Sequence, residues 1–241
     1  ISDADPTFVN ALRRTLVADV PKMAIEDIEF HMGHIIDEET KEEYESVTPL
    51  FDELISHRLG MIPIPTDLDL YEFKDKCKCK GEGCPTCTIM YSLNRKGPCT
   101  VYSGDLEPVR GDKALRIKDD KIPIVKLGKG QAVLIYATAV LGTGKAHAKW
   151  SPVHGAGYSY YPTIKLDKKK CDEIGECVEV CPRNIIKKDE KNKITIAEER
   201  IEDCNLCMSC VERCSGKALM VKGDETKMLF TFETDGSVTA K

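Results

Sequence analysis

The apolar positions near the start of the chain repeat with the period of a helix. Asp5 can cap this segment and Pro6 suits its first turn, while Pro21 prevents its continuation, so the start and stop signals agree with the period. The pattern predicts an amphipathic helix over residues 5–20 with one apolar side. The apolar stripe consists of Phe8, Leu12, Leu16 and Val20, with Val9 beside them.

The same reasoning places further elements along the chain. Residues 25–30 alternate as a strand, residues 37–46 indicate an exposed acidic loop, and residues 51–59 have helical spacing. Residues 61–65 are strand-like, and from residue 66 short β-type runs are separated by Gly and Pro. The strands predicted in this later part are residues 89–93, 100–102, 122–125, 131–141, 158–161 and 228–232.

Composition indicates a globular protein without a strong affinity for nucleic acid. The chain has 241 residues, 41% of them hydrophobic and 31% charged, with a net charge of −5, so no overall basic field exists to hold a phosphate backbone. No apolar run approaches the roughly 20 residues needed to span a bilayer, and we expect a cytoplasmic location. We also expect both ends to be truncated, with residues 234–241 leading into a further helix that the given chain lacks.

The densest chemical signal is a cysteine-rich segment in the last third of the chain. Four of its cysteines follow the spacing C-x2-C-x2-C-x3-C: Cys204, Cys207, Cys210 and Cys214. This spacing is typical of ferredoxins, in which the first three thiolates hold one iron–sulfur cluster and the fourth belongs to the other. Tight clusters in a large chain favour metal ligation over a disulfide framework.

An upstream half supplies the remaining cysteines of this motif, but one position is missing. Ile174 stands where the pattern requires a cysteine. Crossed pairing predicts one complete 4Fe-4S site, with the ligands Cys181, Cys204, Cys207 and Cys210. The second site has three thiolates, those of Cys171, Cys177 and Cys214. It suits a 3Fe-4S cluster, or a 4Fe-4S cluster completed by water or a carboxylate (Asp172, Glu173 or Glu176); an unoccupied or oxidised site is the alternative.

The segment between the two halves has too few apolar residues for an independent core. Residues 185–196 contain four isoleucines that can form a short hairpin under the clusters. A unit of about 50 residues buries too little surface to fold unaided, so we expect the clusters to act as its core.

A second cysteine group lies in the middle of the chain. Its spacing is C-x-C-x4-C-x2-C, formed by Cys77, Cys79, Cys84 and Cys87. Four thiolates on a short Gly-containing loop suit tetrahedral Zn²⁺ in a closed structural site. Reduced thiols or a disulfide within the loop are the alternatives. We interpret Cys99 as a core residue.

With these motifs, the sequence resembles the α-type assembly subunits of cellular RNA polymerases. The segments VNALRRTL, AIEDIEF and DELISHRLGMIPI carry the likeness, and the cysteine groups make the chain similar to the D-type subunit family of archaeal DNA-directed RNA polymerase. The resemblance implies an α+β fold in which a discontinuous dimerisation domain is interrupted by a mixed α/β domain and by a ferredoxin-like iron–sulfur domain. The expected ranges are 1–65, 146–167 and 219–241 for the dimerisation domain, 66–145 for the inserted domain, and 168–218 for the ferredoxin-like domain.

The resemblance also implies a set of partners. In that family the first helix pairs antiparallel with a helix of the small subunit L, and the heterodimer forms the platform for the large catalytic chains, the B chain among them, with the small N and P chains beside it. We expect the interface to include Phe8, Val9, Leu12, Arg13, Arg14 and Leu16. For the two arginines, a solvated helix face is the alternative from sequence alone. Zinc at the cysteine loop would resemble the eukaryotic counterpart of this subunit.

The sequence lacks the chemistry of a polymerase active site. Such a site needs clustered carboxylates to hold Mg²⁺, and no such acidic motif is present, so we expect a non-catalytic subunit. Gly142–Lys145 lacks the frame of a phosphate-binding loop, and we interpret it as a turn. The alternative function is a ferredoxin-type electron-transfer subunit of an oxidoreductase complex.

Overall fold

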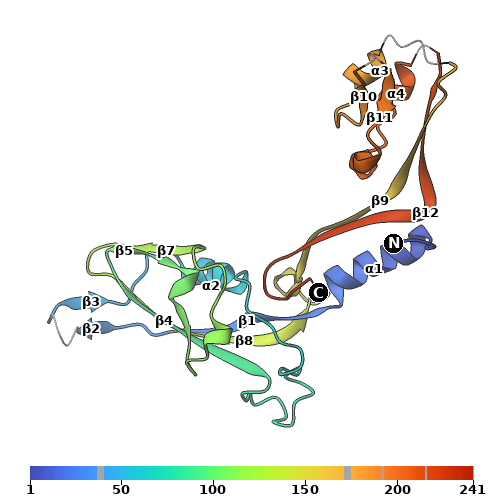
Figure 1. Ribbon diagram of the computed structural model, residues 1–241. Coiled ribbons are helices and arrows are strands. Elements are labelled where there is room, and N and C mark those ends of the chain that lie inside the picture. The colour runs from blue at the N-terminus through green and yellow to red at the C-terminus, as the bar shows by residue number, and fades with distance from the viewer. Residues whose placement is uncertain (37–40, 171–174, 191–192, 215, 241) are drawn as a thin grey trace. The chain divides into compact units, whose positions relative to one another are not determined.

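The computed structural model describes residues 1–36, 41–170, 175–190, 193–214 and 216–240 (Figure 1). The chain divides into two compact units, one formed by residues 1–13 and 156–231 and the other by residues 14–155 and 232–241. In the described residues, no helix combines the length and the apolar character needed to cross a bilayer.

The larger unit is built on a four-stranded antiparallel sheet in the order β1-β8-β4-β6 (Figure 1). Its strands are β1 (Pro21–Phe30), β4 (Thr88–Lys96), β6 (Leu106–Pro108) and β8 (Ala132–Thr143). The central strand β8 alternates buried and less buried positions over most of its length, as a sheet with one covered face requires. The strands predicted at 25–30, 89–93 and 131–141 are confirmed.

Smaller paired strands and short helices complete this unit. The strand β5 (Cys99–Tyr102) pairs with β7 (Pro123–Leu127), and β2 (His34–Ile36) pairs with β3 (Glu43–Glu45). The predicted acidic loop is therefore partly a hairpin, and its residues 37–40 lie outside the described residues. The 3-10 helices are η1 (Ser103–Asp105), η2 (Lys113–Leu115) and η3 (Ala148–Trp150).

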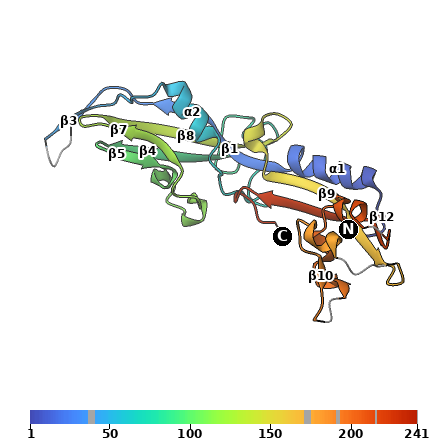
Figure 2. The same ribbon diagram turned by 90° about the horizontal axis from the view of Figure 1, so that it is seen from above.

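The helix α2 (Asp52–Gly60) lies beside β1 and covers the main hydrophobic core (Figure 2). Ile55 and Leu59 are its buried apolar residues. The strand predicted at 61–65 is wrong, because no residue of this segment pairs in a ladder and Met61 has helical dihedral angles at the end of α2. Pro63 and Pro65 lack the N–H that a ladder needs, although the isoleucines beside them are buried.

The turn after β8 is shaped by one aromatic ring. The indole Nε1 of Trp150 donates a hydrogen bond to the carbonyl oxygen of Val140 at 3.1 Å. A Cβ on Gly142 would lie 2.4 Å from that ring, so only glycine fits. Residues 144–146 form a turn, which confirms the interpretation of this stretch as a turn.

A buried ion pair fastens the C-terminal segment of the larger unit to β1. Lys22 and Asp235 form this pair, and their side chains are 4% and 5% exposed. The backbone N–H of Thr66 also donates to the carbonyl oxygen of Ser237 at 2.9 Å. Residues 235–240 contain no helix, and the further helix that they are expected to lead into stays a prediction.

The other unit combines a long two-stranded ribbon with a small cysteine-rich region (Figure 1). The ribbon pairs β9 (Val153–Leu166) with β12 (Leu219–Thr234), and the backbone of Ile1 exchanges two hydrogen bonds with that of Met228. The cysteine-rich elements are α3 (Glu176–Glu179), β10 (Ile186–Lys188), β11 (Ile194–Ile196), η4 (Glu198–Asp203) and α4 (Ser209–Glu212). The predicted hairpin is present, since β10 pairs with β11.

Candidate metal centres and partner-binding helix

Four cysteines from the two halves of the ferredoxin-like motif line one cavity. Its walls also include apolar side chains from the ribbon and the hairpin, such as Ile164, Ile186 and Val221. The cavity brings together the four ligands of the predicted complete site: Cys181, Cys204, Cys207 and Cys210. Thiolates converging in an apolar shell are the donor set of a 4Fe-4S cluster, so these residues fit that group.

The backbone around these cysteines turns its N–H groups inward. Leu206 and Met208 are non-glycine residues with φ of 56° and 64°, and each lies next to a ligand cysteine. Alternation of left-handed and ordinary residues makes successive N–H groups converge into a concavity for an anion. An iron–sulfur cluster with its thiolates is such an anion, which explains why the chain accepts these conformations.

The ionisation of the thiols reflects the same convergence. Burial, with the neighbouring thiols of Cys181, Cys207 and Cys204 as lesser causes, raises the pKa of Cys210 to about 11. Burial also raises the pKa of Cys181, but backbone N–H groups led by that of Ile185 outweigh this and hold it below its ordinary value. A cation bound among these thiols would offset the repulsion that raises the pKa of Cys210.

The two halves repeat each other's local structure at a fixed interval. The helices α3 and α4 have equal length, and each follows a residue in the left-handed region, Gly175 or Met208. In each half the last cysteine accepts a backbone N–H from the fourth residue after it, at 3.4 Å for Cys181 and 3.2 Å for Cys214. This repeat makes Cys177 the counterpart of Cys210, and Ile174 the counterpart of Cys207.

The second cluster site is only partly described. Cys177 is 5% exposed and belongs to the small core of this region, against which Cys214 packs. Cys171 lies outside the described residues, as do Asp172, Glu173 and Ile174. The type of any cluster held there therefore stays a prediction.

The mid-chain cysteine loop has the geometry of a single-ion site. Sγ–Sγ distances are 3.4 Å for Cys77–Cys84, 3.6 Å for Cys79–Cys87 and 3.8 Å for Cys84–Cys87, and the four Sγ atoms all lie within 4.8 Å of one another. A tetrahedral ion with Zn–S bonds of about 2.3 Å separates its sulfurs by about 3.8 Å. These distances exceed the disulfide length of about 2.05 Å, so the disulfide alternative does not describe this structure.

Tight turns bring these four thiols together. Backbone N–H groups of Lys80, Glu82 and Cys87 donate to the carbonyl oxygens three residues earlier, and Gly81 and Gly83 adopt positive φ. Glycine takes that conformation without steric cost. These turns fold the segment so that its four cysteines come together, and Cys77 and Cys87 are buried.

Hydrogen bonding and burial act differently on these thiols. A hydrogen bond from the Thr86 hydroxyl is the largest cause that lowers the pKa of Cys84 to about 6. The backbone N–H of Gly83 is the largest cause that lowers the pKa of Cys79. Burial raises the pKa of Cys87 to about 12. Hydrogen bonding therefore favours ionisation of Cys84 and Cys79, whereas burial opposes that of Cys87. A bound cation would favour the thiolate form of all four.

The helix α1 (Pro6–Ala18) has an apolar ridge that this chain leaves partly uncovered. Its start is as predicted, since the backbone N–H of Phe8 donates to the Asp5 carboxylate at 2.8 Å. Val9 is fully buried, whereas Phe8 is 59% exposed, because consecutive residues point about 100° apart around a helix. Leu12 and Leu16 are half-buried. The apolar pattern in the sequence does not show which of these residues the rest of the chain buries and which it leaves exposed.

The two adjacent arginines of α1 differ in their surroundings. Arg13 is half-buried, and its guanidinium donates to the side-chain oxygen of Asn10 at 3.1 and 3.2 Å. Arg14 is exposed. Of the two, Arg14 therefore has the side chain most accessible to a partner.

Comparison with known proteins supports an iron–sulfur region and identifies the family of the chain. The family model described as RNA polymerase Rpb3/RpoA insert domain matches residues 35–156, and the model described as 4Fe-4S binding domain matches residues 164–187. The chain is 42% identical to DNA-directed RNA polymerase subunit Rpo3 of Thermoplasma volcanium, covering all of this chain and 86% of the relative. Its identity to subunit Rpo3 of Picrophilus torridus is 43% with the same coverage. For subunit Rpo3 of Methanosarcina acetivorans it is 37%, over 100% of this chain and 84% of the relative.

These matches extend over both cysteine regions, the helix α1 and the strands between them. A relative above 40% identity across the whole chain shares its fold and its place in a protein family, and both motifs predicted from spacing fall inside the matched range. The chain therefore belongs to the family of DNA-directed RNA polymerase subunit Rpo3, the D-type subunit of the archaeal enzyme.

Proposed function

We propose that this chain is a non-catalytic assembly subunit of DNA-directed RNA polymerase that pairs through α1 with the small subunit L. The observation that carries the proposal is the open ridge of α1, where Phe8 is 59% exposed in a family of polymerase subunits. Together with the half-buried Leu12 and Leu16, this exposed ring forms an apolar side of one helix that suits contact with another apolar surface. The interface would include Phe8, Val9, Leu12, Arg13, Arg14 and Leu16.

An antiparallel helix pair is the simplest cover for such a ridge. Two amphipathic helices bury their apolar ridges in one another's grooves. Val9 takes part indirectly, because it is already buried and holds α1 in place, whereas Phe8 is available for direct contact. Arg14 would reach a carboxylate or carbonyl of a neighbouring chain with its planar guanidinium.

The unit that carries the insert domain would serve as the platform for the large catalytic chains. The match of residues 35–156 to the Rpb3/RpoA insert domain supports this role, with the polymerase chains B, N and P as the expected neighbours. In the domain scheme behind this proposal, residues 1–65, 146–167 and 219–241 form the dimerisation domain, residues 66–145 the inserted domain and residues 168–218 the ferredoxin-like domain.

The metal centres would stabilise this scaffold. We assign a 4Fe-4S cluster to Cys181, Cys204, Cys207 and Cys210, a second cluster of the 3Fe-4S type to Cys171, Cys177 and Cys214, and Zn²⁺ to the cysteine loop. When bound, the clusters supply the core that the small cysteine-rich region lacks, and their redox sensitivity would make assembly conditional. The electron-transfer alternative is not favoured, because the relatives are polymerase subunits along their length.

The test is formation of a heterodimer with purified subunit L of the same organism, measured by light scattering after gel filtration. We expect a 1:1 complex for the native chain and none for the double variant Phe8→Asp/Leu12→Asp. The matched control is Leu70→Asp, which places a charge on a side chain that is 63% exposed elsewhere and should leave the complex intact. A native chain that stays monomeric beside subunit L refutes the proposal.

A further inference from the structure

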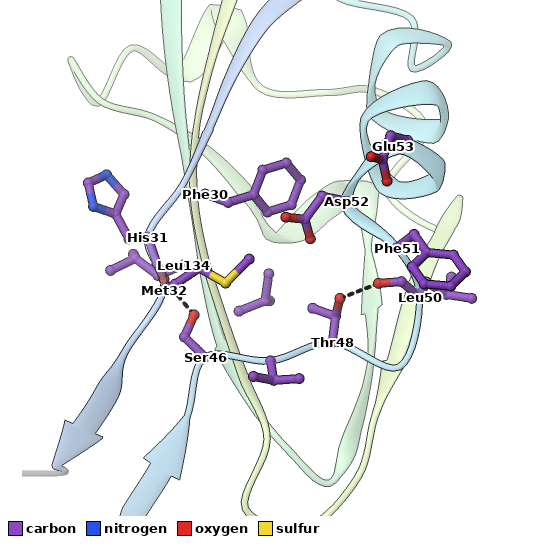
Figure 3. Close-up of a pocket in the computed structure, with 12 residues that line it drawn as sticks. Phe30, His31, Met32, Ser46, Thr48, Leu50, Phe51, Asp52, Glu53 and Leu134 are labelled. Atoms are coloured by element: carbon purple, nitrogen blue, oxygen red, sulfur yellow. Dashed lines mark hydrogen bonds between the residues drawn. The ribbon is translucent and has the colours of Figure 1, made fainter.

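A pocket of about 290 Å³ lies between the end of β1 and the start of α2 (Figure 3). Strand β8 contributes Val133 and Leu134 to it, and the linker 46–51 forms its other wall. Figure 3 shows Met32 and Asp52 approaching it from opposite walls. This pocket is separate from both cysteine regions, and none of its lining residues belongs to α1.

The rim of this pocket exposes large apolar side chains. Phe51 is 78% exposed, Met32 is 68% exposed and Val47 is 43% exposed. Leu54, one helical turn after Phe51, is 49% exposed. Scattered apolar residues on a surface need no explanation, but a group around a concave site marks a surface that another molecule covers.

The backbone of the pocket is held in place before any partner arrives. The hydroxyl of Ser46 donates to the carbonyl oxygen of His31 at 2.6 Å, and the hydroxyl of Thr48 donates to the carbonyl oxygen of Leu50 at 2.6 Å (Figure 3). The backbone N–H of Ser46 also donates to the carbonyl oxygen of Gly33 at 2.9 Å. A preformed site avoids the entropy of ordering a loop on binding.

The charges around the pocket have one sign. Asp52 and Glu53 line it, and no lysine or arginine is among the described residues that form its walls. Within the described part of the chain, neither carboxylate takes part in an ion pair. Glu43 and Glu45, in the strand before the linker, are exposed as well. An occupant must therefore bring positive charge beside its apolar groups.

We propose that this pocket docks a segment of a large catalytic chain of the polymerase, with an aliphatic or aromatic side chain beside Phe51 and Lys or Arg against Asp52 and Glu53. This inference rests on the proposed assembly function and names a second, independent contact for it. A buried aromatic or aliphatic anchor with a charged neighbour is the usual form of an interface hot spot.

Two other occupants are disfavoured by the same charges. A symmetric pair of this chain would place the same patch on both sides, which sets Asp52 and Glu53 of the two copies against each other. Nucleic acid would bring phosphates to carboxylates, which repel them. A basic segment of a partner protein meets both the apolar rim and the charge.

The first experiment identifies the occupant in the intact enzyme. A photo-crosslinking benzoylphenylalanine replaces Phe51 in the full chain, the assembled polymerase is purified and irradiated, and the joined peptide is found by mass spectrometry. We expect one peptide of a large catalytic chain that carries an apolar residue next to Lys or Arg. A crosslink to subunit L, to nucleic acid or to a second copy overturns the proposal, as does the same peptide from a control probe at Leu70.

The second experiment separates this inference from the assembly function itself. Preformed heterodimer with subunit L is titrated onto immobilised large catalytic chains of the same organism. We expect Phe51→Ala to weaken this binding at least tenfold, and Asp52→Asn/Glu53→Gln to weaken it several-fold and flatten its salt dependence. The control Leu70→Ala should bind like the native chain.

The outcomes of this titration are distinct. If the native heterodimer binds the large chains and Phe51→Ala binds equally well, the pocket is not the docking site and the assembly function stands. If the native chain forms no heterodimer with subunit L, the assembly function fails, and this inference fails with it. If Phe51→Ala prevents pairing with subunit L, the pocket belongs to that interface and the proposal is wrong.

Discussion

The two cysteine regions of this chain use the same side chain in different arrangements, one suited to a single ion and the other to a cluster. In the mid-chain loop, all four thiols come from eleven consecutive positions and their sulfurs lie within 4.8 Å, which is the reach of one ion. In the ferredoxin-like region the four thiols come from two halves of the motif and line one cavity. The ligands of the loop are therefore close in the sequence, whereas those of the cluster site come from segments that are distant in the sequence.

The surroundings of the two regions differ as much as their ligands. The loop leads into β4, which belongs to a core with twenty buried members among the described residues. The cysteine-rich region has six buried core members in its described part, and two of them are cysteines. A region with its own hydrophobic core can stay folded when a metal is lost, because only the metal loop is disturbed. A region whose core consists largely of metal ligands should unfold without its metal.

The largest effect should follow from removing cluster ligands. In Cys204→Ser/Cys207→Ser the complete site loses two thiolates, so we expect loss of roughly four irons per chain and unfolding of the region 168–218. Iron and sulfide analysis, the absorption of the cluster, and limited proteolysis measure this. Cys99→Ser is the control and should keep all iron. Protease resistance of this region without iron would show that it folds without a cluster, and the proposed difference in stability between the two cysteine regions would be wrong.

A smaller and local effect should follow from breaking the mid-chain loop. We expect Cys87→Ser, or treatment with a strong chelator, to release one zinc ion per chain and expose the loop to trypsin at its lysines. The rest of the unit should lose about 1–2 kcal/mol and melt roughly 2–8 °C lower, because its core is intact. Zinc released on denaturation and differential scanning calorimetry report both values. Unfolding of the whole unit on zinc loss would show that this unit depends on its metal for folding, as we expect of the ferredoxin-like region.

The smallest effect should come from the core beside that loop, where Tyr91 is fully buried and its hydroxyl donates to the carbonyl oxygen of Leu115 at 2.8 Å. Burial raises the pKa of Tyr91, with Tyr71 as a lesser cause. A phenol with a raised folded-state pKa contributes stability that is complete below its unfolded pKa of about 10 and is lost as pH rises above it.

The matching variant is Tyr91→Phe. We expect it to cost about 1 kcal/mol at pH 7 through the lost hydrogen bond, and to lose less stability than the native chain between pH 9 and 11. Urea unfolding at several pH values measures both effects. Equal alkaline slopes for the two proteins would mean that Tyr91 is not protected by the core.

Much of this fold was predictable where one face of an element is buried. The helix at α1, with its cap at Asp5, and most strands of the main sheet follow from period and turn residues. The strand β12 was predicted only at 228–232, because the polar residues before Met228 show no alternation. A two-stranded ribbon exposed on both faces places little demand on its sequence.

The candidate sites were predictable in their ligands but not in their geometry. Spacing identified which cysteines belong together, since metal chemistry fixes the number and separation of thiolates. Spacing could not indicate the left-handed conformations of Leu206 and Met208, because both residue types normally avoid them. It also could not separate Phe8 from Val9 on α1, because which side of a helix is covered depends on distant parts of the chain.

The ion pair between Lys22 and Asp235 joins residues that lie at opposite ends of the sequence. A buried ammonium group without its carboxylate is costly, so β1 cannot reach its final environment while residue 235 is still inside the ribosome. At about 5–20 residues per second, the ribosome needs roughly 10–40 s to make the intervening chain. Completion of the larger unit must therefore wait until residue 235 has left the ribosome, which gives factors that protect nascent chains a defined interval in which to act.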